Sequence, residues 1–326
     1  MNSYILCILA FLLSIALTLG IERMILPLLK KKAQQPIYTE GPTWHLSKSG
    51  TPTMGGIAFV LAITLSLFIS SFILIFYFEE KLIGVSLILT LLFALGNSLI
   101  GVFDDTMKLM RKKNAGLTPI QKILLQTVLA VIFLMARRHF FADRSIIDFS
   151  FFSLDLGVFY YPIVLILILG TVNCANLTDG VDGLATSVGL SIGIVFLLLG
   201  QGAVDTPVIS SALIGGALGF LFFNVHPAKI FMGDTGSLFL GALAVCLAFS
   251  VGNPWVIIFI GGVYVIEGIS VILQVLIFKL TKKRIFKMAP LHHHLEKCAV
   301  SENRICIIAV IATLLLSSLV PLILRI

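Results

Sequence analysis

The sequence predicts an all-α, polytopic membrane protein with about ten transmembrane helices. Of its 326 residues, 58% are hydrophobic and only 12% are charged, whereas an average soluble protein has about twice that charged fraction. The mean hydropathy is +1.08, and apolar runs of about 20 residues, enough to cross a bilayer, recur along the whole chain. The sequence lacks the alternating segments of about ten residues that a transmembrane barrel requires.

The apolar segments fill most of the chain, so residues 1–326 are predicted to form a single integral membrane domain. The N-terminal segment lacks the basic start and small-residue cleavage site of a signal peptide. The five cysteines are scattered, which predicts neither a disulfide framework nor a thiolate metal site. The predicted spans are 3–26, 52–78, 82–103, 119–137, 158–176, 184–201, 207–224, 237–252, 254–279 and 304–324.

Basic residues are distributed unevenly between the predicted loops. Of the 23 lysines and arginines, 18 lie in or beside the loops that follow the odd-numbered spans. Because such residues stay on the cytoplasmic side, these loops are predicted to be cytoplasmic and both termini outside. The net charge of +7 reflects this bias and suits anionic bilayer lipid, so it requires no nucleic-acid partner. The longest outer loop, 138–157, has the partial alternation of a short hairpin.

Two adjacent carboxylates, Asp104 and Asp105, follow the third apolar segment, and Lys108 comes directly after them. Adjacent carboxylates repel one another, so a cation or a proton is expected beside them. Taken alone, the pair could equally be a solvated helix end. A functional site is favoured because other aspartates recur at comparable positions.

Those aspartates are Asp179, Asp182 and Asp234. Asp179 and Asp182 are each followed by glycine in a cytoplasmic loop without basic residues, although two ordinary Asp-Gly turns have the same pattern. Asp234 lies at the start of the eighth span, where it could be an N-cap or part of an anion site with free N–H groups. Phe231, just before it, could stack on a flat ring or simply pack.

Two further features lie on the predicted cytoplasmic side, and a third lies inside a predicted span. His292, His293 and His294 are consecutive in the last cytoplasmic loop and could donate hydrogen bonds to phosphate. Lys48 could reach a phosphate, or it could be an ordinary positive-inside lysine. Glu267 lies inside the ninth span, where a carboxylate is either functional or a buried structural partner.

Carboxylate oxygens with open positions are the ligands that Mg²⁺ uses when it also binds a diphosphate. Lysines and a helix N-terminus complete an anion-binding cradle. The residues therefore predict Mg²⁺-dependent phosphoryl chemistry at the inner leaflet with one lipid substrate, but they do not name the substrates.

Six motifs, in order along the chain, resemble those of the polyprenyl-phosphate N-acetylhexosamine-1-phosphate transferases. They cover residues 48–56, 101–108, 176–184, 228–237, 265–275 and 290–294. The resemblance implies ten transmembrane helices, often a homodimer, and a site on the cytoplasmic face of the bacterial plasma (inner) membrane. It further implies transfer of phospho-MurNAc-pentapeptide from UDP-MurNAc-pentapeptide to undecaprenyl phosphate. The implied products are UMP and lipid I, an intermediate of peptidoglycan synthesis.

The resemblance also assigns roles to residues. Asp104 is implied to be the base for the lipid phosphate, and Asp234 the Mg²⁺-linked aspartate, a covalent nucleophile in an older two-step scheme. Asp105 is grouped with them as catalytic and metal-binding. Substrate contacts are implied for Lys48, Asn176, Asn224 and Phe231 at the nucleotide, for Lys108, Lys122, His292, His293 and His294 at phosphate or sugar, and for Asp179 and Asp182.

Two local features accompany the resemblance. The ninth helix of the family is broken, which Gly261, Gly262 and Gly268 would permit here. The family often has a Gly-Trp pair where this chain has Ala299-Val300, so the last cytoplasmic loop could differ in shape.

Two alternatives remain open. One is a related transferase that uses UDP-GlcNAc, which the contiguous histidine triplet disfavours. The other is an ion or anion transporter in which Glu267 carries protons. A transporter should place its polar residues near the midplane of the membrane, whereas most of the polar residues here are predicted at the inner ends of the helices.

Overall fold

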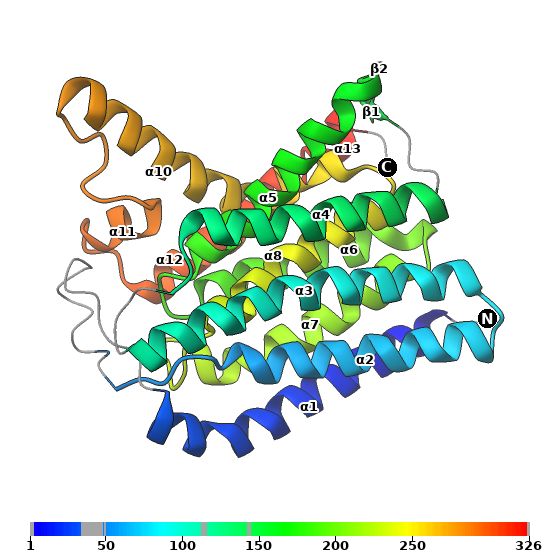
Figure 1. Ribbon diagram of the computed structural model, residues 1–326, viewed down its shortest axis with the longest axis horizontal. Coiled ribbons are helices and arrows are strands. Elements are labelled where there is room, and N and C mark those ends of the chain that lie inside the picture. Colours follow the sequence, from blue (N-terminus) through cyan, green and yellow to red (C-terminus); the bar gives the residue numbers. More distant parts are fainter. Residues whose placement is uncertain (1–2, 34–47, 49, 112–115, 142–144, 325–326) are drawn as a thin grey trace.

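The computed structural model describes residues 3–33, 48, 50–111, 116–141 and 145–324. Figure 1 shows a bundle of long helices, with both chain termini toward the same end and α11 toward the other. Within the described residues, nine helices are long and apolar enough to span a membrane, and α6, with 16 residues, is a shorter apolar helix. The prediction of an all-α, multi-pass membrane protein is confirmed.

The helices coincide with the predicted spans to within several residues. The long helices are α1 (Ser3–Lys32), α2 (Gly56–Phe76), α3 (Lys81–Arg111), α4 (Pro119–Phe141), α5 (Tyr160–Thr178), α6 (Leu184–Leu199), α7 (Asp205–Asn224), α8 (Gly233–Ser250), α10 (Gly262–Thr281) and α12 (Glu302–Ser317). The short ones are α9 (Ile257–Ile260), α11 (Leu291–Glu296) and α13 (Val320–Ile323).

The centre of the bundle is formed by α7 and α8, and 83% of each span is buried. Two glycines bring other helices close to the start of α8. A Cβ on Gly56, where α2 begins, would lie 2.5 Å from the Cα of Gly236, and a Cβ on Gly101 of α3 would collide with the backbone of Asp234. Because these positions lack a side chain, α2 and α3 can both approach the first turn of α8.

The predicted break in the ninth span is confirmed. The helix is interrupted at Gly261 between α9 and α10, and α10 then leans away from the bundle (Figure 1). Gly268 allows α10 to cross α5 closely, because a Cβ there would collide with the Cys174 thiol.

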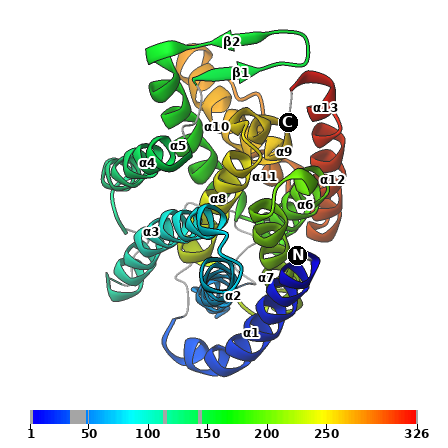
Figure 2. The same ribbon diagram turned by 90° about the vertical axis from the view of Figure 1, so that its right-hand side faces the viewer.

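The predicted hairpin in the longest outer loop is also confirmed. Strands β1 (Ile146–Asp148) and β2 (Ser153–Asp155) pair antiparallel, with Ile146 opposite Asp155. Figure 2, viewed from the end of the bundle that carries the termini, shows the hairpin at the top edge of the picture.

Candidate active site

Three carboxylates from α3 and α8 meet where α3 ends and α8 begins. One oxygen each from Asp104, Asp105 and Asp234 lie within 4.8 Å of one another. The helix extends beyond the predicted third span of residues 82–103, because α3 continues to Arg111. Asp104 is 0% exposed and Asp105 4%, so the pair is not a solvated helix end.

Two lysines bridge these carboxylates. The Lys108 Nζ lies 2.6 Å from Asp104 Oδ2 and 3.3 Å from Asp234 Oδ2. The Lys122 Nζ, from the first turn of α4, lies 2.5 Å from Asp234 Oδ2 and 3.1 Å from Asp104 Oδ2. We call these five residues the aspartate cluster; its three carboxylates share two ammonium groups, so negative charge is in excess when all are ionised.

The two neighbouring aspartates of α3 have different surroundings. Asp105 accepts hydrogen bonds from the backbone N–H groups of Asp234 (3.2 Å) and Thr235 (2.9 Å) and from the Thr235 hydroxyl (2.7 Å). It therefore caps the first turn of α8 from the neighbouring helix. Asp104 accepts one backbone hydrogen bond, from Leu117 at 2.7 Å, and otherwise faces the two lysines. Asp104 is thus better placed to exchange a proton with a substrate.

Two polar residues at the end of α5 extend the cluster. The Asn176 amide donates hydrogen bonds to Asp234 Oδ1 at 3.0 Å and to the Ser237 hydroxyl at 2.8 Å. Asp179 follows α5 directly. Burial, reinforced by the carboxylates of Asp234, Asp105 and Asp182, raises the pKa of Asp179 from 3.8 to about 8. Asp179 is therefore mostly protonated at neutral pH.

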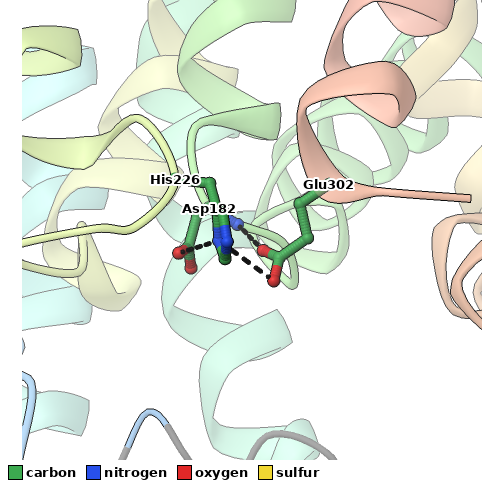
Figure 3. A group of neighbouring side chains, drawn as sticks. All are labelled: Asp182, His226 and Glu302. Atoms are coloured by element: carbon green, nitrogen blue, oxygen red, sulfur yellow. Dashed lines mark hydrogen bonds and ion pairs between the residues drawn. The ribbon is translucent and has the colours of Figure 1, made fainter.

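A second charged group lies nearby, and Figure 3 shows three of its members, Asp182, His226 and Glu302. The Lys48 Nζ lies 2.7 Å from Asp182 Oδ1 and 2.6 Å from Glu302 Oε2. Burial alone would lower the pKa of Lys48, but these two carboxylates raise it above its usual value. We call these four residues the Lys48 cluster.

Asp182 thus belongs to the Lys48 cluster, and its side chain contacts Lys48 and His226 there. Its Oδ2 accepts the Ala228 backbone N–H at 3.0 Å and lies 3.0 Å from His226 Nδ1, while its own backbone N–H donates to Glu302 Oε2 at 3.0 Å. The three acid and imidazole groups are close enough to hold a metal ion. The Lys48 ammonium, however, already supplies a cation to both carboxylates.

Sequence reasoning missed two members of the Lys48 cluster, His226 and Glu302. Glu302 lies in the first turn of α12, as Asp234 lies in the first turn of α8. The helix-start argument applied to Asp234 would have selected it. His226 carries no comparable local signal, since a histidine before a proline is an ordinary loop sequence.

Asn224 and Phe231 lie at the two ends of the loop between α7 and α8. The buried Asn224 amide accepts the Thr186 hydroxyl at 3.1 Å and donates to the Ile230 carbonyl at 3.0 Å. The partly buried Phe231 pairs its backbone with the segment before α2, donating to the Pro52 carbonyl at 2.8 Å. Both residues therefore shape this loop, which leads into Asp234.

The histidine triplet forms half of the short helix α11, and its members have separate hydrogen-bond or ion-pair partners. His292 is wholly buried. His293 Nδ1 lies 2.6 Å from Glu296 Oε2, and His294 Nδ1 accepts the Lys287 backbone N–H at 3.1 Å. The rings of His292 and His293 touch, with centroids 4.3 Å apart, but each of the three imidazoles has a different polar neighbour.

A helical membrane bundle with a buried cluster of carboxylates and lysines at its helix ends defines a class, the multi-pass membrane proteins with a charged site where the helices end. Comparison with known proteins specifies this class further. The family model for Glycosyl transferase family 4 matches residues 87–252. Phospho-N-acetylmuramoyl-pentapeptide-transferase signature 1 matches residues 48–60, which include Lys48.

Curated relatives match nearly the full length. The chain is 44% identical over 299 residues to the phospho-N-acetylmuramoyl-pentapeptide-transferase of Clostridium kluyveri, covering 90% of this chain and 91% of the relative. It is 42% identical over 316 residues to that of Bacillus subtilis, with 96% and 94% coverage. For Halalkalibacterium halodurans the identity is 41% over 305 residues, with 92% coverage of each. The chain belongs to the phospho-N-acetylmuramoyl-pentapeptide-transferase family, which confirms the predicted resemblance.

Proposed function

We propose that this protein transfers phospho-MurNAc-pentapeptide from UDP-MurNAc-pentapeptide to undecaprenyl phosphate, giving lipid I and UMP. The observation that carries the proposal is the aspartate cluster, in a chain whose relatives bear this transferase name. Its buried carboxylates and bridging lysines lie at helix ends, where a lipid phosphate and a water-soluble nucleotide can meet.

The proposed reaction is a single displacement. An oxygen of the lipid phosphate attacks the phosphorus that bears the sugar, and the bond from that phosphorus to the bridging oxygen breaks. The electron pair of that bond leaves with UMP. Asp104 takes the proton of the lipid phosphate, because its Oδ2 contacts only the side chains of the two lysines. Lys108 and Lys122 offset the charge of the phosphates.

We assign Mg²⁺ to the aspartate cluster as its cofactor. The donor set fits, because three carboxylates offer hard oxygen ligands within 4.8 Å of one another. Asp104 Oδ2 has no aligned hydrogen bond among the described residues. Asp234 and Asp104 would hold the ion, with Asp105 fixing Asp234 through its cap on α8. When bound, the ion supplies charge neutralisation of the diphosphate and the departing UMP.

The nucleotide is assigned to the surface between the two clusters. Lys48, Asn176 and Phe231 offer a cation, an amide and an aromatic ring for phosphate, ribose and base. Asp182 and Asn224 hold the flanking loops by their contacts within the protein. His293 and His294 are assigned to the phosphate or sugar, whereas His292 is wholly buried.

The site is proposed to face the cytoplasm of a bacterial cell from the plasma (inner) membrane. The excess of lysine and arginine in the odd-numbered loops supports this orientation. A homodimer, which the family resemblance implies, is part of the same proposal.

Incubation of the purified protein with undecaprenyl phosphate, Mg²⁺ and UDP-MurNAc-pentapeptide or UDP-GlcNAc tests this function by UMP release. We expect lipid-dependent UMP release with the MurNAc-pentapeptide nucleotide and little with UDP-GlcNAc. Asp234→Ala should lose about a thousandfold or more of the rate, because a metal ligand contributes several kcal/mol to the barrier. Glu80→Gln, an exposed carboxylate between α2 and α3, is the matched control and should retain activity.

Three results would contradict parts of the proposal. Comparable rates with both nucleotides would contradict the proposed specificity for the MurNAc-pentapeptide nucleotide. UMP release without lipid would exclude the single displacement. Full turnover in EDTA would exclude the metal.

A further inference from the structure

His292 is wholly buried, and Glu267 of α10 holds one side of it. The His292 backbone N–H donates to the two Glu267 oxygens at 3.2 and 3.3 Å. The Glu267 Oε2 also lies 3.1 Å from His292 Nδ1, although this approach is not aligned as a hydrogen bond. Glu267 is itself only 5% exposed. One carboxylate thus fixes both the start of α11 and the side chain of its first histidine.

The other side of the His292 ring faces the turn between α5 and α6. A Cβ on Gly180 would collide with His292 Nε2. Among the described residues Nε2 has no hydrogen-bond partner, so it contacts this turn by packing. Gly180 follows Asp179 and lies two residues before Asp182. The imidazole therefore lies between the Glu267 carboxylate of α10 and the backbone of the turn that carries Asp179 and Asp182.

The charge of Glu267 determines which nitrogen of His292 is protonated. A bare Nδ1 lone pair facing a carboxylate would be repelled, so Nδ1 carries a proton. The ring is then held by charge attraction on one side and by packing against a glycine on the other. Moving Glu267 or filling the space at Gly180 should shift the ring, and with it the turn.

We propose that Glu267 and His292 are positioning residues for binding of the nucleoside diphosphate sugar. Glu267 holds His292, and His292 holds the turn of residues 179–182 in the shape that receives the nucleotide. The inference rests on the proposed function, because that function assigns the nucleotide to the surface between the two clusters, and this turn connects them through Asp179 and Asp182. It also gives Glu267 a role that needs no transported proton, since its partner is a histidine of α11.

Substitution at Gly180 tests directly whether contact with the His292 ring holds the turn in place. Gly180→Ala places a methyl group against Nε2, whereas Gly170→Ala in α5 is the matched control, because a Cβ there meets nothing within 4 Å. Binding of UDP-MurNAc-pentapeptide is measured by calorimetry without lipid, and KM is measured for both substrates. We expect Gly180→Ala to weaken nucleotide binding about tenfold and to leave the KM for undecaprenyl phosphate unchanged. Gly170→Ala should match the parent protein.

A double-mutant cycle tests whether Glu267 acts through His292. Glu267→Gln and His292→Ala should each weaken nucleotide binding about tenfold, and the double variant should be no weaker than His292→Ala alone. Independent, multiplicative losses would overturn the proposal. An unchanged dissociation constant with a lower kcat would also overturn it, because His292 would then act on the reacting groups directly.

The cycle remains informative if the proposed substrate is wrong. A parent protein that binds UDP-GlcNAc instead would refute the proposed function. The same variants, measured with UDP-GlcNAc, would still test whether Glu267 and His292 position the turn. A parent protein that binds neither nucleotide would overturn both.

Discussion

The aspartate cluster and the Lys48 cluster contain similar residue types but differ in how completely their charges are satisfied. In the Lys48 cluster, both carboxylates contact one lysine, and each also accepts a backbone N–H. In the aspartate cluster, three carboxylates share two lysines, and Asp104 Oδ2 has no aligned hydrogen bond among the described residues.

This difference separates two functions for buried acidic groups. A carboxylate saturated by fixed donors is stabilised in one position and holds the chain segments that surround it. A carboxylate oxygen that faces only lysine side chains, as Asp104 Oδ2 does, can exchange them for a metal ion or a proton. We therefore expect chemistry at the aspartate cluster and shaping of the nucleotide pocket at the Lys48 cluster.

The largest expected effect separates the two aspartates of α3. Asp104→Asn should lower the rate about 10²–10⁴-fold, the usual contribution of a general base, without lowering the melting temperature. Asp105→Asn should lower both, because it removes acceptors from the first turn of α8. Paired measurements of UMP release and thermal unfolding check this. A stable Asp105→Asn variant, or an active Asp104→Asn variant, would remove the distinction between them.

A smaller effect is expected when the Lys48 cluster is disturbed. Glu302→Gln keeps the shape but removes a charge from Lys48 and an acceptor from the Asp182 backbone. The KM for UDP-MurNAc-pentapeptide should rise about tenfold, or ~1.4 kcal/mol, with kcat nearly unchanged. Mn²⁺ binding, followed by electron paramagnetic resonance, should persist in this variant and disappear in Asp234→Ala. The reverse pattern would place the metal at the Lys48 cluster instead.

Asp179 is influenced by carboxylates of both clusters, because, in addition to burial, Asp234, Asp105 and Asp182 all raise its pKa. Its pKa is about 8 in the folded protein, against an ordinary value of 3.8. Between these values the unfolded chain ionises while the folded protein stays protonated, so stability is lost as pH rises. In metal-free buffer, the melting temperature of the parent relative to Asp179→Asn should therefore fall by a few degrees from pH 5 to 8.

Asp155→Asn is the control for this measurement. The Asp155 side chain is exposed on the hairpin, and hydrogen bonds from Gly157 and Ser145 lower its pKa. The parent should therefore show no comparable loss of stability relative to this variant as pH rises. A parent whose stability relative to Asp179→Asn does not change with pH would show that Asp179 is ionised in the folded protein.

The sequence predicted the features that follow from local pattern. Apolar length and loop charge identified the spans, and alternation identified the hairpin. The broken helix was implied by the family resemblance, and Gly261 permits it. Asp104, Asp105 and Asp234 were expected to meet because each lies near a helix end on the same side. Local pattern was sufficient in these cases because the membrane fixes where helix ends lie.

Features that depend on contacts between distant residues were not predictable. Asp179 and Asp182 look equivalent in the sequence, yet only Asp182 is paired with Lys48, 134 residues away. Glu302 joins them from a distance of 254 residues along the chain from Lys48. The three histidines look like one motif, but a short helix directs them to different partners. Side-chain direction, set by helix packing, decided each of these outcomes.

The smallest predicted effect concerns the loop that carries Glu302 into the Lys48 cluster. Ala299, where relatives are expected to have glycine, has a φ of +62°, in a region that costs an L-residue about 1–2 kcal/mol. The loop keeps the left-handed conformation at residue 299 although alanine stands in place of the expected glycine, and Glu302 reaches Lys48. Ala299→Gly should therefore stabilise the protein by up to about 1 kcal/mol in thermal unfolding and leave the KM for the nucleotide unchanged. Ala312→Gly, inside α12, is the matched control and should destabilise by about 1 kcal/mol. If Ala299→Gly were destabilising as well, relief of backbone strain would be excluded, and the shape of this loop would have to depend on the Ala299 side chain.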